Sequence, residues 1–275
     1  MGDLVFAAIA PHGELAIPEA CAQHERGLAL ATQAAMAELG SRFDASRPDS
    51  VIVLTPHNVH VDRHMAVVTA ATLEGRLPVS ASPIQLRVPG DRQLALEILD
   101  AMREAGVPAL GVSFGGNVPA EAVMPMDWAT LIPLWFMGGR GPAPIPAVVL
   151  APARDLSPAL HVRAGQAIRE AVRGSDRRVA VIASCDHGHA HQPDGPYGFH
   201  AAAAEFDRRV QEHLRAQDLE GIAAFDPALV ADAKADSWWQ MLLLHGTLGR
   251  GWRAHLLSYE VPTYFGMLCA AFSPV

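Results

Sequence analysis

The stretch that most constrains the fold is VAVIASCDHGHAH, residues 179–191. Its first part, Val179–Ser184, is almost wholly apolar and is typical of a strand buried on both faces. Histidines and an acid begin where that strand should end. Similar short apolar runs recur along the chain, at Leu4–Ala10, Val51–Thr55 and Ala147–Leu150. Continuous rather than alternating runs favour a parallel or mixed sheet that is covered by helices.

Helical segments lie between these runs, and the alternation predicts an α/β fold. We expect one domain over residues 1–275, with a mixed or parallel central sheet, helices on both faces and a metal site at the C-terminal ends of the strands. Ser157 and Asp127 are predicted helix N-caps. The expected helices are Pro18–Leu39 (stopped by Gly40), Leu94–Ala105, Ser157–Arg173, Ala201–Ala216, Pro227–Ala235 and Trp238–Leu248, and late strands are expected at His255–Glu260 and Phe265–Phe272.

Composition excludes several classes of protein. Half of the 275 residues are hydrophobic and 18% are charged, which is unlike a disordered chain. The formal charge of −8 argues against nucleic-acid binding. No uncharged apolar stretch reaches the roughly 18 residues of a membrane helix. Three cysteines without a CxxC pair argue against a disulfide framework and predict a cytoplasmic protein.

Two histidines follow apolar runs at the edge of the predicted sheet. His12 comes after Pro11 and His57 after Pro56, so each strand is expected to leave the sheet abruptly and present an imidazole. The carboxyl ends of strands border the ligand crevice of an α/β sheet. A matched pair of imidazoles there suits a divalent metal, although each could instead be a hydrogen-bonded loop histidine.

Glu260 is the third candidate metal ligand. A carboxylate in an apolar run is costly to bury unpaired, and a metal would stabilise its charge. The alternative is a salt bridge with Arg253 or Arg63. Two imidazoles and one carboxylate form the facial triad of non-haem Fe(II) oxygenases, and the same set could hold Zn²⁺ for hydrolysis.

The segment after residue 184 carries histidines at alternate positions. In an extended segment, His187, His189 and His191 would share one face. One could be an acid/base and another a second donor near the metal, whereas for His191 we expect a solvated loop. Cys185 is expected to be a packed thiol. The motifs GxGxxG, GxxxxGK[ST] and GxSxG do not occur.

Five motifs in order resemble the class III extradiol ring-cleavage dioxygenases over nearly the whole chain. The most similar type is the catalytic β subunit of protocatechuate 4,5-dioxygenase. Many members of that family carry Asp-His-Gly where this chain has Asp127-Trp128-Ala129. A secondary active-site histidine of the family is therefore missing here. The motifs are APHG (Ala10–Gly13), LTPHN (Leu54–Asn58), MDWATLIPLWF (Met126–Phe136), ASCDHGHAH (Ala183–His191) and LSYEVPTYFGM (Leu257–Met267).

The resemblance implies an activity and roles for named residues. Fe(II) would be bound by His12, His57 and Glu260, with His189 as acid/base catalyst and His187 as second choice. The substrate would be a small aromatic diol of the catechol type, cleaved with O₂ to a muconic-semialdehyde type product. The resemblance also implies a homodimer and allows a separate small companion subunit.

Two other functions remain open from the sequence. One is a Zn²⁺-dependent hydrolase, in which Asp186 or Glu14 would act as base. The other is a non-catalytic binding protein on the same scaffold, like the Memo-type relatives. If the ring of a substrate carries a carboxylate, Arg63 and Arg140 are candidate partners for it.

Overall fold

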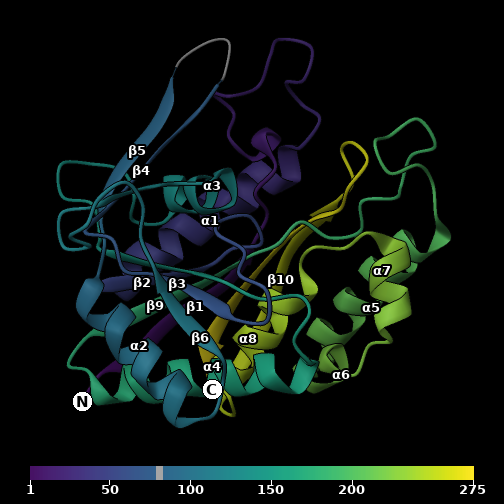
Figure 1. Cartoon of the computed structure of the whole chain (residues 1–275). Helices are drawn as coiled ribbons and strands as arrows, with labels where there is room; N and C mark the ends of the chain where they lie inside the picture. Colours follow the sequence, from purple (N-terminus) through teal and green to yellow (C-terminus); the bar gives the residue numbers. More distant parts are fainter. Residues whose placement is uncertain (79–82) are drawn as a thin grey trace.

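The computed structural model describes residues 1–78 and 83–275, which fold around an eight-stranded sheet (Figure 1). Its strands are β1 (Asp3–Ala10), β2 (Ser50–Leu54), β3 (Met65–Val68), β6 (Ala109–Val112), β8 (Ala147–Ala151), β9 (Arg178–Ser184), β10 (Trp252–Glu260) and β11 (Met267–Pro274). Their spatial order is β10-β11-β1-β9-β2-β8-β3-β6. The pairs β1–β9, β9–β2, β2–β8 and β3–β6 are parallel, and the remaining pairs are antiparallel. The mixed sheet predicted from the apolar runs is confirmed.

Helices cover both faces of this sheet (Figure 1). The helices are α1 (Leu30–Ser46), α2 (Arg92–Glu104), α3 (Trp128–Phe136), α4 (Pro158–Gly174), α5 (Ala201–Ala216), α6 (Leu219–Ala223), α7 (Pro227–Ala233) and α8 (Trp238–Leu248), with a 3-10 turn at Glu14–Ala16. One face packs on α2, α4 and α8. The other packs on α1, α3 and a small sheet of β5 (Ile84–Pro89), β4 (Thr72–Leu77) and β7 (Val123–Pro125). Among the described residues, no helix combines the length and apolarity needed to cross a membrane.

The central strands read as unbroken apolar runs because both of their faces are covered. In β1, Ala7 and Ile9 belong to the core beneath α4 and α8, whereas Phe6 and Ala8 belong to the core beneath α1 and α3. Successive side chains of a strand point to opposite faces, so a strand between two helical layers needs apolar residues at every position. The apolar run Val179–Ser184 lies in β9 (Arg178–Ser184), near the centre of the sheet.

The first helix differs from the prediction in both of its bounds. It was expected over Pro18–Leu39 but begins at Leu30, after turns that include Gly27 at φ 100°. It then continues through Gly40 to Ser46 instead of stopping there. A Cβ at residue 40 would lie 2.8 Å from Phe136 O. Gly40 therefore serves the close packing of α1 on α3 rather than the end of the helix.

The predicted helix N-caps are confirmed. The carboxylate of Asp127 accepts from Thr130 N at 2.9 Å at the start of α3, and Ser157 Oγ accepts from Leu160 N at 3.4 Å at the start of α4. Each side chain satisfies a backbone N–H that has no partner within its helix. Asp127 thereby fixes where α3 begins, directly beside the loop that follows β2.

Candidate metal centre

His12 lies two residues beyond β1, and the end of β9 holds both its main chain and its ring. Its backbone N donates to Asp186 Oδ1 at 3.0 Å, and its Nδ1 lies 3.0 Å from Ser184 Oγ. The Ser184 hydroxyl donates its one proton to Ala129 O at 2.6 Å, so Oγ accepts from His12 Nδ1–H. The lone pair of His12 is therefore on Nε2, as a metal ligand requires.

His57 is held in the loop after β2 by contacts with the beginning of α3. Its backbone N donates to Thr55 Oγ1 at 3.2 Å, and that hydroxyl donates to Asp127 Oδ1 at 2.9 Å. Asn58 Nδ2 donates to the other oxygen of Asp127. The imidazole stacks on Trp128 with ring centroids 4.4 Å apart. The helix cap at Asp127, the loop after β2 and His57 are thus connected by hydrogen bonds. Trp128, which stands where relatives are expected to carry a histidine, packs against the ring of His57.

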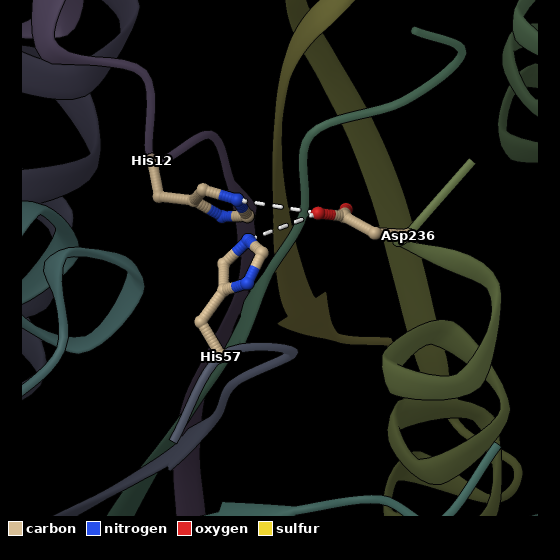
Figure 2. A group of neighbouring side chains, drawn as sticks. All are labelled: His12, His57 and Asp236. Carbon is tan, nitrogen blue, oxygen red and sulfur yellow. Dashed lines mark ion pairs between the residues drawn. The ribbon is translucent and has the colours of Figure 1, made fainter. Parts of the chain in front are cut away.

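Asp236 completes a group of possible ligands with the two histidines (Figure 2). Its Oδ2 lies 3.2 Å from His57 Nε2 and 3.5 Å from His12 Nε2. One ligand atom from each residue lies within 4.8 Å of the other two. Asp236 is 6% exposed, and its Oδ1 is buried without a hydrogen-bond partner among the described residues.

This donor set fits a divalent metal ion. Bonds from such an ion to imidazole N or carboxylate O are about 2.0–2.2 Å, so neighbouring ligand atoms lie roughly 3.0–3.6 Å apart. The separations of Asp236 Oδ2 from both Nε2 atoms lie in this range. Both imidazole nitrogens and the carboxylate oxygen face a common point in Figure 2.

The two carboxylates beside His12 favour a positive charge on its imidazole. Burial by itself lowers the pKa of His12, but the carboxylates of Asp186 and Asp236 outweigh it and raise the pKa to about 9. Burial by itself raises the pKa of Asp236, yet His12 and His57 bring it well below its usual range. Burial raises the pKa of Asp186. A proton on His12 thus supplies the positive charge that a metal would supply.

Glu260, the third ligand expected from the sequence, does not lie in this group. It is the last residue of β10, and its Oε1 accepts from Thr32 N at 2.7 Å. Thr32 lies in the first turn of α1, whose N-cap residue Ala29 offers no side-chain acceptor. The backbone N–H and the positive end of the helix dipole stabilise the Glu260 carboxylate at this position.

The sequence carried a weak signal for Asp236. The residue precedes Ser237 and the apolar helix α8, a position where an acid ordinarily suggests a helix cap. Among the described residues, the side chain of Ser237 makes no capping hydrogen bond. The basic partners of Asp236 in this part of the chain are the two histidines. The missing cap is visible only in the structure, so the signal in the sequence was no more than an acid beside an apolar helix.

His189 lines the same cavity as His12 and His57. Its Nδ1 lies 2.7 Å from His187 O, which can only accept, so the lone pair is on Nε2. The ring stacks on Phe265 with centroids 5.3 Å apart. His187 is fully buried; its Nδ1 lies 3.2 Å from Ser237 Oγ, and burial lowers its pKa.

His191 is not in a solvated loop as expected. Its Nε2 lies 2.9 Å from Asp207 Oδ2, and the side chain is 12% exposed. Asp207 also accepts from Gly188 N and from the hydroxyl of Tyr259, each at 2.8 Å. The contact ties the histidine segment to α5 and β10. Cys185 is a fully buried thiol, as predicted.

A cavity of about 580 Å³ opens onto His12, His57 and His189. Its aromatic lining and its size suit a small planar ring. Arg63 and Arg140, the cations suggested by the sequence, are not among its lining residues. The aromatic side chains are Trp128, Tyr197, Tyr264 and Phe265, and the acidic ones are Glu14, Glu25 and Asp186.

Comparisons with known proteins identify the family of this chain. The family described as the catalytic LigB subunit of aromatic ring-opening dioxygenase matches residues 7–270. A protein of Clostridium acetobutylicum is 22% identical over 253 residues, which are 91% of this chain and 53% of that protein. The chain thus spans about half the length of that curated relative.

A solved structure shares the fold. An uncharacterized protein from Escherichia coli K12 superposes with a TM-score of 0.62 at 16% identity, covering 97% of this chain and 99% of the other. The family match extends from β1 to β11 and includes both histidines and Asp236. The chain therefore belongs to the family of catalytic LigB subunits of aromatic ring-opening dioxygenases.

Proposed function

We propose that this protein is a non-haem Fe(II)-dependent extradiol dioxygenase that opens a catechol-type ring with O₂. His12, His57 and Asp236 would hold the iron, with Asp236 in the place expected for Glu260. The observation that carries the proposal is the group of two imidazoles and one buried carboxylate with ligand atoms within 4.8 Å. It borders an aromatic-lined cavity of about 580 Å³.

His12, His57 and Asp236 would hold a ferrous ion, which when bound would supply a site for the two hydroxyls of a diol and for O₂. The chain itself supplies orientation. Ser184 fixes the tautomer of His12, and Trp128 holds the ring of His57. The aromatic walls Tyr264 and Phe265 confine the plane of a bound ring and exclude water from one side of it.

Proton transfer would fall to His189. Its Nε2 carries the lone pair because Nδ1 donates to His187 O. It can therefore take a proton from a substrate hydroxyl and return it to oxygen as the ring opens. General acid/base catalysis of this kind contributes typically about 10²–10⁴-fold. His187 would position His189 through its carbonyl rather than act on substrate, because its ring is fully buried.

The decisive experiment loads the protein with Fe(II) without oxygen and then adds a panel of catechols and O₂. We expect consumption of one O₂ per ring opened and a yellow ring-fission product. His189→Phe should retain iron but turn over slowly, by about 10²-fold or more. Absence of O₂ uptake with every diol from a fully iron-loaded protein would contradict the proposal.

One observation favours a second candidate, a Zn²⁺-dependent hydrolase. The buried carboxylate of Asp186 lies 3.4 Å from His12 Nε2, where it could accept a proton from a metal-bound water. This candidate predicts turnover without O₂ and higher activity with Zn²⁺ than with Fe²⁺. A non-catalytic, Memo-like binding protein would show neither activity.

The homodimer and the small companion subunit stay predictions, to be measured by sedimentation of the purified protein.

A further inference from the structure

A second cavity, of about 290 Å³, lies against the same metal group. It shares His57, His189 and Tyr197 with the larger cavity, and Asp236 also lines it. Two cavities therefore meet at the candidate metal centre. The first ends at His12 and Asp186, and the second continues past Asp236 towards the end of α7 and the start of α8.

The two cavities have opposite charge. The larger one is lined by Glu14, Glu25 and Asp186 and, among the described residues, by no arginine or lysine. The smaller one is lined by Arg154 and Lys234, and the acid that lines it is the candidate ligand Asp236. The electrostatic potential therefore changes sign across the metal centre, and an anion is favoured only in the second cavity.

Lys234 occupies its position at a conformational cost. It is the single lysine of the chain. It is the C-cap of α7 with φ 55°, a left-handed conformation that glycine adopts most readily. No carboxylate among the described residues lies within salt-bridge distance of its ammonium group. Its charge is thus available to a ligand.

Arg154 is presented to the cavity by an aromatic support. Its guanidinium carbon lies 4.7 Å from the ring centroid of Trp239, which also lines the cavity. Stacking of this kind orients the guanidinium and leaves its edge free to bind a carboxylate. Within the described part of the chain, Arg154 makes no salt bridge.

We propose that Arg154 and Lys234 bind the carboxylate that ring opening creates, so that the product is held in the smaller cavity and not in the acid-lined one. This inference rests on the proposed function. The carbon–carbon bond beside a hydroxylated carbon breaks, and both atoms of O₂ enter the product. One carbon becomes an aldehyde and the other a carboxylic acid, which releases a proton at neutral pH. A neutral diol thus yields an anion.

The kinetic test uses Lys234→Gly and Arg154→Gln in the iron-loaded enzyme with unsubstituted catechol. Glycine suits the left-handed backbone at residue 234, so this variant should fold normally. We expect the inhibition constant of the ring-opened product to rise about tenfold in each variant, because a charge-assisted contact is lost. The KM for the neutral catechol should change less than about twofold.

Arg47→Gly is the matched control. Arg47 is also a cationic C-cap in the left-handed conformation, at φ 46°. It lies before β2, at the end of that strand away from His57 and the metal group. Both kinetic constants should stay unchanged. Unaltered product inhibition in both test variants would overturn the inference. So would a raised KM for 3,4-dihydroxybenzoate with unaltered product inhibition, since the cations would then bind a substituent of the substrate.

A binding test separates this inference from the proposed function. Muconate, an unreactive dicarboxylate, and its neutral diamide are titrated into the full-length protein and followed by calorimetry. We expect muconate to bind at least about tenfold more tightly than the diamide, and this preference to vanish in Lys234→Gly and Arg154→Gln. Equal binding of both compounds, or a preference that survives both substitutions, would refute the subsite. If no diol is oxidised, the proposed function fails while this titration still decides whether the carboxylate site exists.

Discussion

Asp236 and Glu260 are two acids in comparable sequence settings that meet different partners. Each lies next to an apolar element, one before α8 and the other at the end of β10. Asp236 lies between two imidazoles, whereas Glu260 accepts the N–H of Thr32 at the start of α1. A carboxylate withdrawn from water needs compensation, which two imidazoles provide for Asp236 and a helix N-terminus provides for Glu260.

The largest effect is expected when the acid beside the histidines is neutralised. In Asp236→Asn we expect almost complete loss of bound iron and an activity at least about a thousandfold lower, because a charged ligand is removed. Metal analysis beside O₂ uptake measures both. Iron retained at full occupancy in this variant would contradict the assignment of Asp236.

A smaller effect is expected from the hydroxyl that orients His12. Ser184→Ala removes the acceptor of His12 Nδ1–H, so the unliganded nitrogen loses its fixed orientation. We expect metal affinity to fall by about 10–100-fold. Ser50→Ala is the matched control, because Ser50 is equally buried but lies at the other end of the sheet, in β2. Equal metal affinity in the two variants would refute the role of Ser184.

The pH dependence of the metal-free protein tests the same histidine–acid contact. The pKa of His12 is raised from 6.5 to about 9. Its protonation therefore stabilises the fold fully below pH 6.5, and this stabilisation is lost as the pH rises through 9. The pKa of Asp236 is lowered, so its contribution is present above its usual pKa and is lost as pH falls below it.

We therefore expect the melting temperature of the metal-free protein to decline between pH 6.5 and pH 9. In Asp236→Asn this decline should be shallower, because one of the two acids that raise the pKa of His12 is gone. Thermal melts at a series of pH values, with a chelator present to keep the protein metal-free, measure this decline. A melting temperature that rises over this interval would contradict the contact.

The smallest effect is expected at Glu260. Glu260→Gln keeps an acceptor for Thr32 N but loses the charge at the start of α1. The free energy of unfolding should fall by about 0.3–1 kcal/mol, with bound iron and activity unchanged. Denaturant unfolding and metal analysis measure the two parts. Loss of iron here would restore Glu260 as a ligand and reverse the comparison.

The sequence allowed the central sheet and two of the three metal-group residues to be predicted. Buried strands are visible as apolar runs, and His12 and His57 directly follow such runs, so local sequence was sufficient for them. The small sheet of β4, β5 and β7 was not predicted. Only one of its two long strands, β5, alternates buried and exposed residues throughout, which is a weaker signal.

The third residue of the candidate metal group could not be predicted from local sequence. Asp236 approaches the histidines only because α7 and α8 bring their connection over the carboxyl ends of β1 and β2, and that path depends on tertiary packing. Glu260 was favoured by its apolar neighbours. The amide that stabilises it comes from Thr32, 228 residues earlier in the chain, which no spacing in the sequence indicates.

The close contact between α1 and α3 at Gly40 affects the position of a side chain in the candidate active site. Helix α3 packs on α1 at Phe136 O, and its opposite end carries Trp128 against His57. A single methyl group at residue 40 would displace one end of this short helix and thereby shift the tryptophan at the other. The position of Trp128 in the cavity wall thus depends on a glycine that does not line the cavity.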